Sequence, residues 1–300
     1  MSIYSQRDSN IRKTWLLFTV FLVIVIGIGW FISYVYQNQL ILIIAVLFSV
    51  VMSITSYWYS DKIVLAMSRA HLIEKKNAPE LYNIVENLAI TAGLPMPRVY
   101  LIDDAAPNAF ATGRNPEHAV VAVTRGLLEK LDRSELEGVL AHELSHIGNR
   151  DILLSTVVVV LVGFVSLISD FFLRSLFWRG LGGRDRDSGQ VGAILMLIGI
   201  VMAVLAPIAA VLMQLAISRK REFLADASAA LLTRYPRGLA SALEKISKDQ
   251  TPLRVANNTT AHLFIASPFK GRRAKSWLAK LFMTHPPIEE RITRLKQMSI

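Results

Sequence analysis

Four long uncharged stretches constrain this chain more than any other feature of its sequence. The first two, residues 15–36 and 40–59, are separated by three polar residues only. A helix of about 20 apolar residues crosses the roughly 30 Å hydrocarbon core of a bilayer. Both stretches are long enough to cross, and their short connection predicts a transmembrane hairpin. A cleavable signal peptide is the competing interpretation of the first stretch, but that stretch is too long for one and runs directly into a second span.

The third and fourth stretches are residues 152–169 and 191–217, with Pro207 as a predicted kink in the fourth. Their length and lack of charge favour segments embedded in the membrane. Two core helices of a large soluble domain are the alternative. Whether the two stretches cross the bilayer or only enter it stays open at this stage.

The charges beside these stretches indicate which side of the membrane the chain occupies. Arg7, Arg12 and Lys13 outnumber Asp8 in the N-terminal tail, while residues 37–39 carry no charge. Because cytoplasmic loops are enriched in Lys and Arg, we expect the tail and the chain after residue 60 to be cytoplasmic. The Arg-rich loop at 174–190 disagrees, since two complete crossings would place it outside.

Composition narrows the chemistry that the polar parts can perform. The chain is 53% hydrophobic and 19% charged, and it contains no Cys, whereas a soluble domain is about 25% charged. A disordered chain, a collagen and a disulfide-stapled scaffold are excluded. Without thiolates, any metal must be held by imidazole and carboxylate groups.

The polar segment 61–151 has the pattern of a mixed α and β domain. Apolar residues from Leu81 to Leu88 recur at helical spacing, and β-rich runs follow at 98–102, 108–112 and 119–124. Asp132 and Glu135 form a capping box, which predicts that a helix begins there.

That helix contains His142, Glu143 and His146 in the pattern HELSH. Two His residues four apart lie on one face of a helix, so both imidazoles can bind one Zn²⁺ ion. Glu143 is then placed to accept a proton from water activated by the metal. The alternative is that the two His residues are solvated on a helix surface and bind no metal.

A catalytic zinc site needs a third protein ligand. Glu222 and Asp226 are four apart on a predicted helix just after the fourth stretch. We expect Glu222 to bind the metal, and Asp226 and Arg219 to support the ligands from outside. Ion pairs along a solvated helix face are the alternative interpretation of these charges.

Taken together, these motifs resemble the M48 family of zinc metallopeptidases, and within it the bacterial HtpX membrane proteases. The matching segments, in chain order, are 108–113 (NAFATG), 142–146 (HELSH), 218–226 (SRKREFLAD), 282–287 (FMTHPP), and Arg291 with Ile292.

The resemblance implies a mainly α, α+β zincin-like (gluzincin) fold with a small β-sheet. It implies one Zn²⁺ per subunit on His142, His146 and Glu222, with Glu143 as the general base. His285 and Arg291 would stabilise the oxyanion or hold the Glu222 helix. An edge strand, comprising Asn108, Ala109, Phe110 and Ala111, would pair with the substrate backbone.

The resemblance also implies an endopeptidase of the bacterial inner membrane, with its site facing the cytoplasm and a role in quality control of damaged membrane proteins. The expected organisation is a tail and hairpin (1–60), a peptidase domain (61–151 and 218–300) and an inserted hydrophobic pair (152–217). His146 precedes residue 152 by about 9 Å of helix, so we expect the site near the bilayer surface and substrates cut beside their membrane spans.

Three other functions compete with this interpretation. A membrane scaffold or holdase would use its metal structurally, with four ligands. An intramembrane protease would need apolar flanks around HELSH, and the flanks here are polar enough to be solvated. Nucleic acid could bind the basic and aromatic residues of 269–282, but a lipid surface or plain solvation suits a membrane-tethered chain better.

Overall fold

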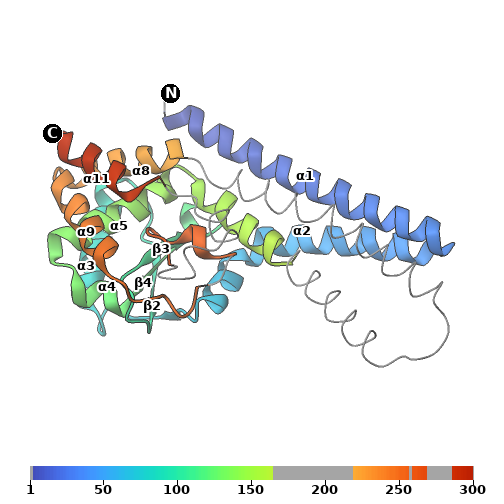
Figure 1. Cartoon of the computed structure of the whole chain (residues 1–300), viewed down its shortest axis with the longest axis horizontal. Helices are drawn as coiled ribbons and strands as arrows, with labels where there is room; N and C mark the ends of the chain where they lie inside the picture. The colour runs from blue at the N-terminus through green and yellow to red at the C-terminus, as the bar shows by residue number, and fades with distance from the viewer. Residues whose placement is uncertain (1–2, 165–218, 257–258, 269–285, 300) are drawn as a thin grey trace.

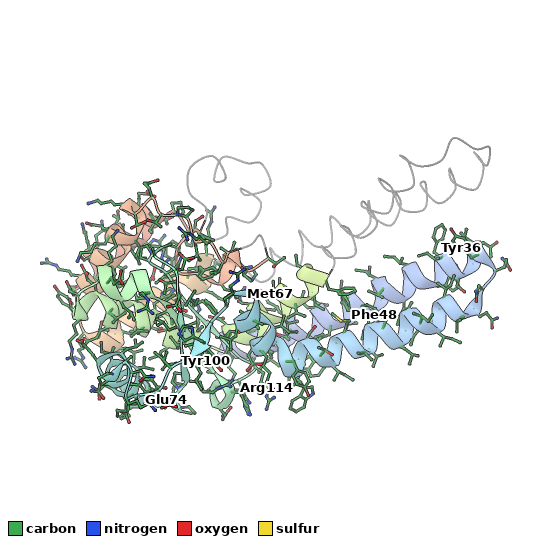
Figure 2. All side chains as sticks on the ribbon, turned by 90° about the horizontal axis from the view of Figure 1, so that it is seen from below. Tyr36, Phe48, Met67, Glu74, Tyr100 and Arg114 are labelled. Carbon is green, nitrogen blue, oxygen red and sulfur yellow. The ribbon has the colours of Figure 1, made fainter. Side chains whose placement is uncertain are left out.

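The computed structural model describes residues 3–164, 219–256, 259–268 and 286–299. Its most extended feature is the pair of long helices α1 (Ile3–Tyr36) and α2 (Gln39–Met67), which forms the predicted hairpin (Figure 1). Asn38 caps α2 by accepting a hydrogen bond from the Leu40 backbone N–H. Figure 2 shows Tyr36 at the far end of the hairpin and Met67 where it joins the rest of the protein.

The hairpin exposes its apolar side chains rather than burying them. In α2, only 11% of the most apolar window is buried, and both helices are long and apolar enough to cross a membrane. Large side chains such as Trp15, Trp30 and Leu47 lie more than half exposed along the hairpin. An exposed apolar surface of this size favours contact with lipid.

A four-stranded sheet lies at the base of the hairpin. Its strands are β1 (His71–Leu72), β2 (Arg98–Ile102), β3 (Ala109–Thr112) and β4 (Val120–Thr124), in the spatial order β1-β2-β4-β3. The central pair β2/β4 is parallel, and the two outer pairs are antiparallel. The three predicted strands are confirmed. The very short β1 was not expected, because two residues carry no alternating pattern.

Besides the hairpin, the described residues form the helices α3 (Pro79–Thr91), α4 (Arg125–Lys130), α5 (Arg133–Gly148), α8 (Arg219–Thr233), α9 (Pro236–Lys248) and α11 (Ile288–Gln297). The buried α5 packs against α8, α9 and the sheet. Its approach to α9 depends on Gly138, where an added Cβ would lie 2.7 Å from the Leu239 backbone nitrogen. The predicted capping box of Asp132 and Glu135 is confirmed at the start of α5.

The third hydrophobic stretch begins with a helix, Asp151–Phe164, which bends by 85° away from α5. Arg150 adopts a positive φ of 57° at the break. The single helix assumed between His146 and the stretch is therefore wrong, because a left-handed residue ends α5 first. The new helix packs on α1 through Leu154, Val157 and Leu161. The rest of the third stretch, the loop at 174–190 and the fourth stretch lie outside the described residues.

Candidate metal centre

Helix α5 presents two imidazoles to a common point. His142 and His146 have ring centroids 4.7 Å apart, and their Nε2 atoms lie 3.2 Å from each other. Both Nε2 atoms face the same side because residues four apart share one helix face. The alternative interpretation of two solvated His residues is wrong, since His142 is only 1% exposed.

Helix α8 brings Glu222 to the same point. Its Oε2 lies 3.8 Å from His142 Nε2, and its Oε1 lies 3.6 Å from His146 Nε2. One ligand atom from each of the three residues can be chosen so that all lie within 4.8 Å of one another. Two imidazole nitrogens and one carboxylate at this spacing can hold a metal ion.

A carboxylate orients each imidazole from behind. Asp226 Oδ1 lies 3.0 Å from His142 Nδ1, and Asp151 Oδ2 lies 3.0 Å from His146 Nδ1. In each ring the Nδ1–H donates to a carboxylate, which turns Nε2 towards the metal position. The structure places Asp226 where the sequence analysis expected it. Asp151 was missed, because the GNRD flank of the motif was taken to be solvated, whereas Asp151 is 3% exposed.

Arg291 of α11 holds Asp226 in turn. Its Nε and Nη2 donate to the two carboxylate oxygens of Asp226 at 2.9 and 2.7 Å, and its Nη1 donates to the Ile265 carbonyl at 3.0 Å. Arg291 is 1% exposed and lies 3.9 Å from Glu222. Of the two roles left open for Arg291, the geometry favours holding the α8 helix.

The charges of this cluster shift the pKa values of its groups in different directions. Burial, together with the positive charge of Arg291, lowers the pKa of His142 to about 4. Burial also opposes a charge on His146, but hydrogen bonding to Asp151 and the negative charge of Glu222 outweigh it and raise that pKa to about 9. Metal binding at these two imidazoles competes with protons, because a ligand nitrogen must be unprotonated to bind the ion.

A small cavity opens beside the three ligand residues. It has a volume of about 40 Å³, and the residues that line it include Glu143, Ala111, His262, Leu263 and Ile265. A cavity of about 10–15 Å³ is enough to hold one water molecule. The space therefore admits a metal ion and a water molecule, and Glu143 lines the same cavity. His262 was not singled out by the sequence analysis, because its spacing fits no ligand motif.

Strand β3, which contains three of the four expected substrate-binding residues, lies at the edge of the sheet. Thr124 of β4 donates its backbone N–H to the Asn108 carbonyl, and Asn108 N–H donates to Thr124 Oγ1. Hydrogen-bonded residues alternate along an antiparallel strand, so the N–H and C=O groups of Ala109 and Ala111 point away from the sheet. The Ala109 carbonyl accepts a hydrogen bond from Ile265 N–H at 3.0 Å. Within the described chain, the outward groups of Ala111, beside the cavity, are left for another partner.

The structure does not bring every expected residue to the centre. Arg219 is exposed at the start of α8. The support expected from Arg219 is found instead in Arg221, which is buried and lies 3.8 Å from Asp151. Arg219 lies a turn before Glu222, beyond the packed part of the helix. His285 and the basic cluster at 269–282 lie outside the described residues.

The chain is similar to several known proteins. The model of "Peptidase family M48" matches residues 75–299. A "Protease HtpX homolog" of Thermoanaerobacter pseudethanolicus is 47% identical over 302 residues, which cover 100% of this chain and 99% of the relative. A protein of the same name from Thermococcus sibiricus is 48% identical over 290 residues, which cover 95% of this chain and 96% of the relative. The crystal structure of S. mikatae Ste24p has 22% identity and a TM-score of 0.48, and covers 97% of this chain and 67% of that one.

Proposed function

The chain belongs to peptidase family M48 and is a membrane metalloprotease, and from this premise we propose that it uses zinc to cut polypeptides beside their membrane spans. The observation that carries the proposal is the position of Glu143 in the same cavity as the ligand residues His142, His146 and Glu222. A site of this kind combines a metal ion with a proton acceptor, which is what hydrolysis of a peptide bond requires.

The donor atoms fit zinc. Two imidazole nitrogens and one carboxylate are a ligand set of catalytic zinc sites, which keep a fourth position open. The sequence has no Cys that could supply thiolate ligands instead. The carboxylates of Asp226 and Asp151 behind the imidazoles are a further feature of such sites, because they fix which ring nitrogen is the ligand.

When bound, Zn²⁺ supplies a Lewis acid that polarises the scissile carbonyl and makes water more acidic. Glu143 accepts the proton of the attacking water and passes it to the leaving amine. Asp226 and Asp151 keep both imidazoles in the orientation that leaves Nε2 free. Arg291 keeps Asp226 in place, and His285 is proposed to stabilise the oxyanion of the intermediate.

An extended substrate strand is proposed to pair with the outward N–H and C=O groups of Ala111. These groups lie beside the cavity, so a peptide bonded to them passes the ligand residues. Pairing through the main chain places few demands on substrate sequence. The Ala109 carbonyl already accepts a hydrogen bond from Ile265 N–H. The proposal therefore narrows the expected substrate-binding segment 108–111 to its C-terminal end, at Ala111.

The position of the transmembrane hairpin supports membrane proteins as the substrate class. Its apolar side chains are exposed, and the helix that starts at Asp151, next to the metal centre, packs on α1. A site held this close to a transmembrane helix meets the juxtamembrane segments of other membrane proteins. We place the protein in the inner membrane as a multi-pass enzyme whose site faces the cytoplasm, with a role in clearing damaged membrane proteins.

A scaffold or holdase with a structural metal is the alternative function. A structural site is closed by a fourth ligand, whereas the metal-ligating group among the described residues has three members. The decisive variant is Glu143→Ala in the full chain, reconstituted in lipid with a membrane-protein substrate. We expect zinc content to stay at the wild-type level and cleavage to stop.

The same preparation tests the substrate class. A substrate with one cleavable segment beside its membrane span is compared with the same segment placed far from the span in a soluble protein. Faster cutting of the first supports the proposal, and equal rates would contradict it. Wild-type cleavage by the Glu143→Ala variant would overturn the assignment of the base.

A further inference from the structure

A buried amide in the first transmembrane helix contacts the metal centre. Asn10 of α1 is 1% exposed. Its Nδ2 donates to Asp151 Oδ1 at 2.5 Å and to the Asn149 carbonyl at 3.2 Å. The two partners lie close to the break after α5, about 140 residues further along the chain. In the view of Figure 1 the start of α1 lies near α8, the helix that carries Glu222.

The carboxylate of Asp151 divides its hydrogen bonds between two partners, and Arg221 Nη1 lies 3.8 Å from its Oδ1 as well. Oδ2 lies 3.0 Å from His146 Nδ1, and Oδ1 receives the amide of Asn10. The amide orientation follows from chemistry, because a carboxylate accepts hydrogen bonds and the amide oxygen cannot donate one. Asn10 therefore fixes the rotation of the group that orients His146.

The position of Asn10 is set by helix packing. Thr14, Leu17 and Phe21 follow it at intervals of four, three and four residues, and all three are buried. Leu17 and Phe21 pack against Leu154 and Val157 of the helix that begins at Asp151. The buried face of α1 therefore continues from an apolar contact in the membrane hairpin to a polar contact at the metal centre.

We propose that Asn10 is a positioning residue for the metal ligand His146, acting through Asp151, so that the first transmembrane helix completes the catalytic unit. The inference rests on the proposed zinc site but reaches beyond it, because Asn10 precedes the segment 75–299 that matches the family model. Removing the amide leaves Asp151 Oδ1 without this donor in a buried site. The carboxylate then turns, and His146 loses its fixed orientation.

The test uses the full chain in detergent or lipid. Asn10→Leu removes the donor at similar side-chain size, and Asn10→Asp keeps the shape but places a second carboxylate against Asp151. Zinc affinity is measured by competition with a chelator, and the visible spectrum is recorded for the Co²⁺-loaded protein. We expect about a tenfold loss of affinity and a shifted Co²⁺ spectrum in both variants. Thr14→Val, on the same buried face but without a contact to Asp151, is the matched control and should behave as wild type.

A double variant separates positioning from general damage. If Asn10 acts through Asp151, adding Asn10→Leu to Asp151→Asn should weaken zinc binding no further than Asp151→Asn alone. Wild-type zinc affinity and an unchanged Co²⁺ spectrum in the Asn10 variants would overturn the inference. The proposed function fails separately, if the wild-type chain binds no zinc or if Glu143→Ala still cleaves.

Discussion

Arg291 and Asp226 form a buried two-point ion pair, with Nε and Nη2 of the guanidinium donating to the two carboxylate oxygens at 2.9 and 2.7 Å. The pair joins α11 to α8, and the same carboxylate holds His142. A residue of the candidate metal centre, His142, is therefore oriented by a charge from the last described helix of the chain. Fork geometry makes this contact specific to Arg, because a Lys ammonium is a single point charge.

Replacement of Arg291 by Lys should weaken metal binding without removing any ligand. The ammonium can reach one oxygen of Asp226 but not both, so Asp226 and His142 lose their fixed orientation. We expect a 10- to 100-fold loss of zinc affinity, measured by chelator competition. Arg125→Lys is the matched control, because Arg125 is exposed and its Nε and Nη2 both donate to Asp103, outside the candidate metal centre. Equal affinities in the Arg291→Lys variant and the wild type would contradict the role given to Arg291.

The same ion pair predicts how stability depends on pH. Burial would raise the pKa of Asp226, but the charge of Arg291 and the hydrogen bond to His142 outweigh it and lower that pKa from 3.8 to about 2. The unfolded chain therefore binds the proton first as the pH falls. The stabilisation, about 2 kcal/mol, is complete above pH 4 and is lost between pH 4 and 2.

Chelator-treated protein in detergent provides the measurement. The loss of stability between pH 5 and pH 2.5 should be smaller in Asp226→Asn than in the wild type, because the variant has no carboxylate to protonate. Unfolding is followed by denaturant titration at each pH. An identical pH dependence in the two proteins would show that Asp226 does not carry this linkage.

Replacement of Ala111 by Pro tests the edge strand. The Ala111 N–H points away from β4, so a Pro at this position removes no hydrogen bond of the sheet. An edge strand tolerates Pro where the backbone N–H is not used in the sheet. We expect kcat/KM to fall about five- to tenfold, the worth of roughly one hydrogen bond, with zinc affinity unchanged. Peptide hydrolysis and chelator competition are measured on the same preparation. Full activity would mean that the substrate backbone does not pair at Ala111.

Much of the metal centre could be predicted because its signals are local. His142 and His146 share a face at a spacing of four, and so do Glu222 and Asp226, whatever the rest of the chain does. The structure brings these four together. Arg219 was misplaced because the periodicity of a helix does not say where along its length the packed part begins.

The residues that the sequence analysis missed act over longer distances. Asp151 follows His146 closely, but a polar residue next to an expected membrane segment is typical of a solvated boundary. Only the bend after α5 turns its carboxylate back towards His146 and buries it. The partner of Ala109, Ile265, comes from a segment that has no strand pattern.

The sequence by itself determined the hairpin, the strands of the sheet, the helix that carries HELSH and the ligand types. These features depend on hydrogen bonds and periodicity within a few residues. Only the tertiary structure decided that Arg291 reaches Asp226 across 65 residues and that Asn10 reaches Asp151 across 141. Such contacts have no local signal, because they depend on how separate helices pack, and packing is decided by the whole core at once.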